Sequence, residues 1–92
     1  MTVKIRFFAR FRELLGNDII TDVDAGKMFT PLITNIAQKN PEGYAAIFDE
    51  TGAFREFVIL MKNGKRIEIA DAARTPVEDG DEIAVFPPVA GG

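Results

Sequence analysis

Hydrophobic and polar residues alternate along several short stretches of this chain. Residues 3–8 place Val3, Ile5 and Phe7 between Lys4, Arg6 and Phe8, and residues 82–86 show a similar alternation. A period of two is typical of a strand with one buried face. The pattern predicts strands over residues 3–7, 19–23, 57–62, 66–69 and 82–86.

A different spacing marks the helices. Apolar residues between 29 and 39 recur every three or four positions, which predicts the main helix over this range, with Thr30 as its N-cap and Pro31 at its first helical position. A shorter helix is expected over residues 9–15, ended by Gly16. Residues 41–52 are expected to be irregular apart from one turn near residues 44–48. The core stripe of the main helix is Phe29, Leu32, Ile33, Ile36 and Ala37.

Turn signals between the strands also bear on the fold. Asn63-Gly64 predicts a tight hairpin, because both residue types tolerate a positive φ. Residues 77–81 are expected to turn before the last strand, and residues 71–74 to form a loop or single turn. The resulting order is strand, strand, helix, strand, strand, strand, so we expect an α+β domain with the helix on one sheet face.

Composition excludes several classes of function. The chain of 92 residues contains no Cys and no His, which removes disulfides, His general bases and the usual zinc ligands. Its net charge is −3 without a basic stripe, so nucleic-acid binding is not expected. No apolar run approaches the ~18 residues of a membrane span. We expect a cytoplasmic protein with no metal site, and interpret Asp79 and Asp81 around Gly80 as turn residues.

Strand parity predicts a surface for a partner protein. If Val3, Ile5 and Phe7 face the helix, Phe8 faces outward, and Phe86 does so in the last strand. The same reasoning puts Ile59 and Met61 in the core. Grouped exposed apolar residues are typical of a docking site. The residues expected on the outward surface are Phe8, Val58, Leu60, Arg66 and Phe86.

The end of the chain carries the candidate chemistry. Gly91 and Gly92 bury nothing and have no Cβ, so a carboxylate there is an unhindered acyl group that fits a narrow channel. Pro87 and Pro88 favour an extended, stiff spacer and remove two backbone donors. We therefore expect a folded domain over residues 1–86 and an extended segment over 87–92, in which Val89 and Ala90 also contact the partner.

Two motifs at opposite ends of the chain narrow the interpretation. Residues 7–16, FFARFRELLG, resemble the opening of the MoaD family, the small subunit of molybdopterin synthase. Residues 77–92, VEDGDEIAVFPPVAGG, resemble that family's ending almost throughout. Archaeal small ubiquitin-like modifiers share both motifs. The resemblance implies a ubiquitin-like β-grasp fold, with a mixed five-stranded sheet, one main helix on one face and a flexible C-terminal Gly-Gly tail.

The resemblance also implies a reaction. In the family, a ubiquitin-activating-type enzyme uses ATP and magnesium to adenylate the terminal carboxylate, here that of Gly92. Sulfur from a persulfide then gives a thiocarboxylate, which the large subunit of molybdopterin synthase uses to build molybdopterin. The chain itself would bind no cofactor stably, would be a monomer when free, and would be a non-catalytic carrier subunit of a synthase-type complex.

Two alternatives remain open from the sequence. A lysine of a target protein attacking the same adenylate would form an isopeptide bond, which would make the chain a ubiquitin-like modifier. A plain interaction module with an inert end is the third possibility. The residues do not separate these possibilities, nor do they decide whether the chain counts as part of an enzyme.

Overall fold

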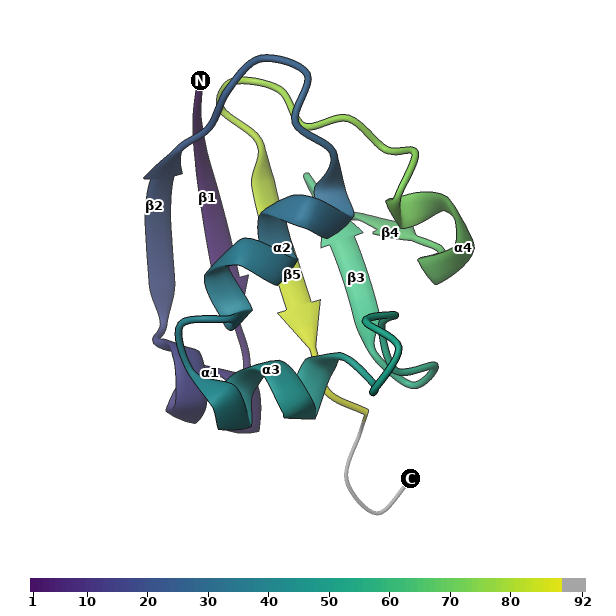
Figure 1. Cartoon of the computed structure of the whole chain (residues 1–92). Coiled ribbons are helices and arrows are strands. Elements are labelled where there is room, and N and C mark those ends of the chain that lie inside the picture. The colour runs from purple at the N-terminus through teal and green to yellow at the C-terminus, as the bar shows by residue number, and fades with distance from the viewer. Residues whose placement is uncertain (89–92) are drawn as a thin grey trace.

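The structure, a computed structural model, describes residues 1–88. It contains five strands and four helices in one α+β domain (Figure 1). The strands are β1 (Thr2–Phe7), β2 (Asp18–Asp22), β3 (Ile59–Lys62), β4 (Lys65–Ile67) and β5 (Glu82–Phe86). The helices are α1 (Arg10–Leu15), α2 (Phe29–Ala37), α3 (Pro41–Ile47) and α4 (Ile69–Ala72).

The strands form one mixed sheet in the order β2-β1-β5-β3-β4. β1 pairs antiparallel with β2, and β3 pairs antiparallel with both β4 and β5. The central pair, β1 and β5, is parallel, which joins the first and last strands of the chain side by side (Figure 1). The predicted fold class, with a five-stranded mixed sheet, is therefore confirmed.

The core lies between the sheet and α2, which crosses one sheet face (Figure 1). The predicted helical stripe is buried, since Phe29 and Ile33 are fully covered and Leu32 is 3% exposed. From the sheet, β1 and β5 contribute every second residue to the same core. These strand residues are Val3, Ile5, Phe7, Ile83 and Val85.

The predicted cap of α2 is wrong. The helix begins at Phe29 with Met28 in the cap position, two residues earlier than the predicted cap Thr30, and no side chain caps it. The Phe29 N–H instead donates to the Thr75 carbonyl at 2.8 Å, and Met28 forms an isolated bridge with Pro76. A distant segment of backbone thus replaces the local cap.

The segment after α2 is more regular than predicted, because α3 covers seven residues. Asn40 is its cap and accepts from the N–H groups of Glu42 and Gly43, with Pro41 in the first turn. The Asn40 side-chain amide also donates to the Leu14 carbonyl at 2.6 Å, which ties α3 to the end of α1. A Cβ on Gly43 would lie 2.5 Å from Leu15 Cδ2, so glycine permits this close packing.

The predicted hairpin between β3 and β4 is confirmed. Asn63 has φ 51° and Gly64 has φ 82°, the positive values that a tight two-residue turn of this kind requires. The register Lys62↔Lys65 places the turn directly between the strands. Within residues 1–88, no helix combines the length and apolarity needed to cross a bilayer.

Candidate functional site

Two aromatic side chains pack together where β1 and β5 end. The rings of Phe8 and Phe86 are stacked, with centroids 4.1 Å apart and planes 9° from parallel. The Phe8 N–H donates to the Val85 carbonyl, which extends the parallel pairing by one residue. Both side chains are partly exposed on the sheet face away from α2. The structure therefore brings together two of the predicted surface residues.

The side chains of the third strand are buried on the opposite face from the one predicted. Val58 is 2% exposed and Leu60 is fully buried, whereas Ile59 and Met61 are only partly covered. The reason is the register with β5, in which Leu60 lies opposite the buried Val85. All four residues are apolar, so the strand has no polar side from which its inward face can be recognised.

An apolar surface is still present on the outward sheet face, but different β3 residues contribute to it. Ile59 lies opposite Phe86 in the register, and therefore beside the stacked rings on the outward face. Met61 lies opposite Ala84 on that face, and Arg66 opposite Met61. Sequence reasoning missed Ile59 and Met61. We call the outward group of Phe8, Ile59, Met61, Ala84 and Phe86 the apolar patch.

The chain leaves the sheet beside this patch. Pro87, directly after β5, is partly covered and Pro88 is exposed. The other predicted contact residues, Val89 and Ala90, and the proposed reactive residues, Gly91 and Gly92, lie outside the described residues. The described structure thus supplies a surface next to the root of the predicted reactive segment.

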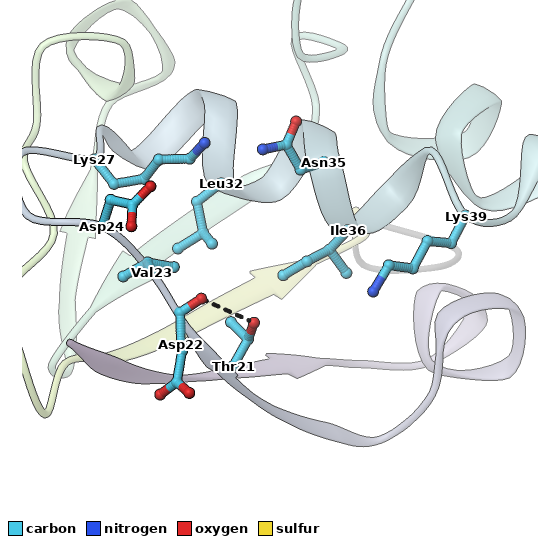
Figure 2. Close-up of a pocket in the computed structure, with 9 residues that line it drawn as sticks. All are labelled: Thr21, Asp22, Val23, Asp24, Lys27, Leu32, Asn35, Ile36 and Lys39. Atoms are coloured by element: carbon cyan, nitrogen blue, oxygen red, sulfur yellow. Dashed lines mark hydrogen bonds between the residues drawn. The ribbon is translucent and has the colours of Figure 1, made fainter.

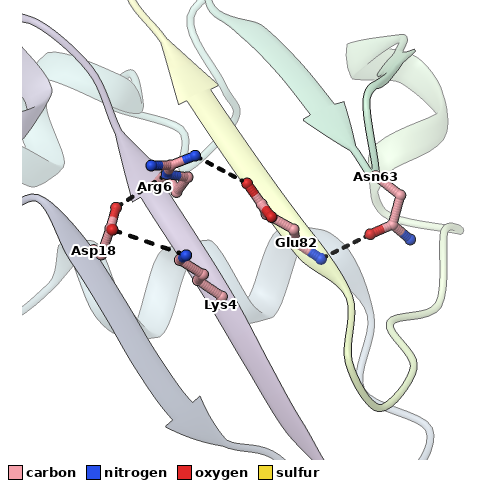
Figure 3. Close-up of polar contacts among 5 residues, drawn as sticks. All are labelled: Lys4, Arg6, Asp18, Asn63 and Glu82. Carbon is pink, nitrogen blue, oxygen red and sulfur yellow. Dashed lines mark hydrogen bonds and ion pairs between the residues drawn. The ribbon is translucent and has the colours of Figure 1, made fainter.

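Charged side chains cover the other half of the same sheet face (Figure 3). Arg6 lies between two carboxylates, with Nε 3.1 Å from Asp18 Oδ1 and Nη1 3.2 Å from Glu82 Oε1. The hydrogen bond and negative charge of Asp18, followed by Glu82, raise the pKa of Arg6 above its usual value. Lys4 lies 3.9 Å from Asp18. These contacts form a row of alternating negative and positive side chains across β2, β1 and β5.

A buried carboxylate holds the turn before β5. Asp81 is 6% exposed and accepts from the Glu78 N–H at 2.7 Å and from Asn63 Nδ2 at 2.8 Å, with Lys62 Nζ 3.5 Å away. Burial raises the pKa of Asp81, but these donors and the Lys62 charge outweigh it, so the pKa lies below its usual value. Asn63 also accepts from the Glu82 N–H (Figure 3).

The contacts of Asp79 and Asp81 agree with the interpretation of residues 77–81 as a turn. Asp79 Oδ1 accepts from the Thr2 N–H at 2.7 Å, so its carboxylate ties the turn to β1. In the part of the chain that the structure describes, no three carboxylates gather as a metal site would require. These acidic residues therefore organise the entry into β5.

Comparisons with known proteins agree with the motifs. The model of the ThiS family matches residues 5–92. The chain is 36% identical to small archaeal modifier protein 3 of Haloferax volcanii over 93 residues, covering 100% of both chains. It is 29% identical to the molybdopterin synthase sulfur carrier subunit of Escherichia coli, covering 98% of this chain and 99% of that protein.

Solved structures have the same architecture. The crystal structure of small archaeal modifier protein 1 from Haloferax volcanii matches with a TM-score of 0.87 at 25% identity, covering 100% of both chains. A complex of subunits 1 and 2 of the molybdopterin-converting factor of Helicobacter pylori matches with a TM-score of 0.61 at 27% identity, again covering 100% of both chains. This chain belongs to the ThiS family and is homologous to small archaeal modifier proteins and molybdopterin synthase sulfur carrier subunits, with their ubiquitin-like β-grasp fold.

Proposed function

We propose that this protein is a sulfur carrier whose Gly92 carboxylate is adenylated and then converted to a thiocarboxylate that donates sulfur in molybdopterin biosynthesis. The observation that carries the proposal is the extent of the family match, which continues through residue 92 and includes Gly91 and Gly92. A relative named as a molybdopterin synthase sulfur carrier subunit matches 98% of the chain.

The residues near the end suit this chemistry. A carboxylate is a poor electrophile, so a partner enzyme would use ATP and magnesium to form the acyl-adenylate and release pyrophosphate. A persulfide sulfur would displace AMP, and a thiol would cleave the resulting acyl disulfide to leave the thiocarboxylate. Because Gly91 and Gly92 have no side chain, the acyl carbon can approach enzyme backbone closely. In this proposal residues 1–86 form the folded domain that binds the partner enzymes, and residues 87–92 are the reactive segment.

The apolar patch would bind first the adenylating enzyme and then the large subunit of molybdopterin synthase. Stacked aromatic side chains that remain partly exposed are typical anchors of protein interfaces. Phe86 directly precedes Pro87 in the chain and stacks on Phe8, so a partner bound to these rings would receive the reactive segment. Arg66 lies on the same face and would pair with an acidic group of the partner. The Helicobacter pylori complex of subunits 1 and 2 supports a partner subunit of this kind.

A second candidate function has its own support. The relative with 36% identity over the whole chain is named a small archaeal modifier protein. In that role a lysine amine of a target protein would attack the same adenylate, release AMP and form an isopeptide bond with Gly92. Both functions need the same activation step, and one protein can serve both.

Mass spectrometry of the protein from its native cell tests the assignments. A sulfur carrier is expected to show a form about 16 Da heavier, because sulfur replaces one oxygen of the carboxylate. A modifier is expected to leave Gly-Gly remnants on lysines of other proteins. The intact mass also checks that Gly92 ends the chain. If neither product appears under conditions in which the adenylating enzyme is active, both functions are wrong.

Truncation tests the reactive segment directly. Removal of Gly91 and Gly92 is expected to abolish ATP–pyrophosphate exchange by the adenylating enzyme and to leave the melting temperature unchanged. Gly92→Ala is the matched control: it retains a terminal carboxylate and adds one methyl group, so it should lower the exchange rate without abolishing it. Full exchange with the truncated protein would show that the reactive group lies elsewhere.

A further inference from the structure

The loop between α3 and β3 is braced by its own side chains. Phe48 and Phe54 form an isolated bridge, and their rings are stacked with centroids 4.6 Å apart. Tyr44 of α3 also stacks on Phe48, with centroids 5.0 Å apart. The Asp49 carboxylate accepts from two backbone N–H groups of the same loop, at 2.8 and 3.2 Å. Aromatic packing and turn hydrogen bonds thus fix the path of the chain before β3.

A tight turn at the end of this loop presents Phe57. The Val58 N–H donates to the Arg55 carbonyl at 3.0 Å, which closes a turn over residues 55–58. The Arg55 side chain donates from Nε to the Ala45 carbonyl at 2.8 Å and so ties the turn to α3. Phe57 is 46% exposed, although Phe54 and Val58 are buried. We call residues 55–58 the Phe57 turn.

The Phe57 turn lies beside the root of the reactive segment. β3 is antiparallel to β5 and Ile59 lies opposite Phe86, so β3 begins at the end of the sheet at which β5 stops (Figure 1). Phe57 precedes Ile59 by two residues, which places their Cα atoms within about 8 Å of each other. β5 lies between β1 and β3 in the sheet. The root is therefore flanked by Phe8 on the β1 side and by Phe57 on the β3 side.

The short reach of the reactive segment brings a partner close to both flanks. Residues 87–92 span at most about 20 Å when they are fully extended. An enzyme that holds Gly92 in its active site must therefore bring its own surface against the domain around Phe86. Exposed aromatic side chains on a well-held scaffold are typical interface anchors. A contact on the β1 side alone would leave the Phe57 ring in water at the same interface.

The charges around Phe57 indicate the chemistry that its binding pocket needs. A hollow of about 300 Å³ beside the ring is lined by Asp49, Phe54, Arg55, Glu56 and Phe57, so its carboxylates outnumber its one guanidinium group. Arg55 is directed to the backbone of α3, and Asp49 to the backbone of its own loop. Glu56 is exposed and belongs to no ion pair within residues 1–88. A complementary surface is apolar at its centre and carries a cation at its rim.

The hollow between β2 and α2 has neither property (Figure 2). It is lined by equal numbers of carboxylate and ammonium groups, so its charges balance. These groups belong to Asp22, Asp24, Lys27 and Lys39. Its apolar residues, Leu32 and Ile36, are 3% and 6% exposed and already belong to the core. The comparison favours the Phe57 turn, where a large apolar side chain is exposed.

An exposed apolar residue far from the root provides a control. Ile20 of β2 is 70% exposed. It lies opposite Lys4 in the register of β1 and β2, and Lys4 lies opposite Glu82, at the start of β5. Ile20 is thus separated from Phe86 both across the sheet and along it. Its exposure matches that of Phe57 without the position beside the reactive segment.

We infer that the Phe57 turn is a second docking point for the adenylating enzyme, which receives the Phe57 ring in an apolar pocket and pairs a cationic group with Glu56. The enzyme then holds the root of the reactive segment from both sides, through Phe8 and Phe86 on one side and through Phe57 on the other. The inference rests on the proposed function, because the adenylating enzyme is its occupant.

Steady-state ATP–pyrophosphate exchange with the full-length protein tests the docking point. Phe57→Ser is expected to raise the KM for this protein at least about fivefold. Its kcat should stay within about twofold, because the Gly92 carboxylate is unchanged. Ile20→Ser removes a more exposed apolar side chain and should leave the KM within about twofold. Glu56→Lys is expected to raise the KM at least about threefold at low salt, because an attractive contact becomes repulsive.

A conservative variant keeps the test independent of folding. Phe57→Leu retains most of the apolar side chain, so its KM should lie between those of the wild type and Phe57→Ser. Circular dichroism melts show which variants are folded at the assay temperature, and Phe57→Leu carries the comparison if Phe57→Ser is not.

Three outcomes overturn the inference while the wild type is active: an unchanged KM for the Phe57 variants, equal KM increases for Phe57→Ser and Ile20→Ser, or an unchanged KM for Glu56→Lys. In each of these the proposed function stands if removal of Gly91 and Gly92 still abolishes exchange. An absence of exchange with the wild type itself would instead overturn the proposed function, and this inference with it.

Discussion

The two faces of the sheet differ in the side chains that they present. The face toward α2 is apolar along the central strands, and its residues are buried whether they come from β1, β3 or β5. The outward face is divided: the β1–β2 half holds the Arg6 ion pairs, and the other half holds the stacked rings of Phe8 and Phe86. The buried inner face accounts for stability, whereas we propose that the outer face contacts a partner protein.

Two neighbouring residues of β3 show the difference between the inner and outer faces most clearly. Leu60 and Ile59 are both aliphatic and adjacent, yet Leu60 is fully buried and Ile59 belongs to the outward apolar patch. Leu60→Ala is expected to lower the free energy of unfolding by about 2–5 kcal/mol, because it leaves a cavity in the core. Ile59→Ala should lower it by less than about 1 kcal/mol.

Urea unfolding followed by circular dichroism measures both values. Equal losses for the two variants, or a larger loss for Ile59→Ala, would mean that the β3 register is shifted by one residue. Such a result would restore the parity that the sequence alone suggested.

Two adjacent acidic residues at the start of the last strand allow a second comparison, between a buried and an exposed carboxylate. Asp81 continues the inward alternation of Ile83 and Val85, whereas Glu82 is exposed. Asp81→Asn is expected to cost about 1–3 kcal/mol of stability, because a buried donor loses its acceptor. Glu82→Gln should have a much smaller effect, since the one ion pair of its carboxylate within residues 1–88 is with the partly exposed Arg6.

The sign of the pH dependence follows from the lowered pKa of Asp81. In the unfolded chain this carboxyl titrates near ~3.9. The native state holds fewer protons than the unfolded state in this range, so the stability contribution of Asp81 is present above about pH 4 and is lost as the pH falls through the lower native pKa. Thermal melts from pH 7 to pH 2 should show a shallower acid loss in Asp81→Asn than in the wild type.

Phe86 tests whether the outward apolar patch serves binding. Phe86→Asp is expected to weaken binding to the adenylating enzyme at least about tenfold, because a charge would replace an anchor of the stacked pair. The loss of stability should stay below that of Leu60→Ala, since Phe86 is partly exposed. Calorimetry of the complex and a melting curve of the free protein separate the two effects. A melting temperature as low as that of Leu60→Ala, with unchanged binding, would assign Phe86 to the core.

The charged half of the outward face should contribute least. Arg6→Ala removes contacts with Asp18 and Glu82, but exposed ion pairs are weak and screened by salt. We expect the melting temperature to fall by less than about 4 °C at low salt, and by less still at about 1 M salt. A large, salt-independent fall would show that the aliphatic part of Arg6 packs as a structural element of the sheet.

Much of the fold could be predicted from local patterns. The alternation at residues 3–7 and 82–86, the stripe of α2 and the Asn63-Gly64 turn each depend on neighbouring residues, and each appears in the structure. α3 was predictable as well, because Asn40-Pro41 is a helix-start signal, although residues 41–52 were expected to be mostly irregular. The start of α2 was not predictable, since its first N–H is satisfied by Thr75 from a distant loop.

The sequence by itself determined the α+β architecture and the apolar character of the strands, and it suggested the chemistry that we propose for Gly91 and Gly92, because these depend on residue types and their spacing. Only the tertiary structure decided which side of β3 is buried, since a strand apolar on both sides acquires its orientation from the register with β5. The pairing of Phe8 with Phe86 was decided in the same way. These rings come from opposite ends of the chain, and the parallel β1–β5 pairing brings them into contact.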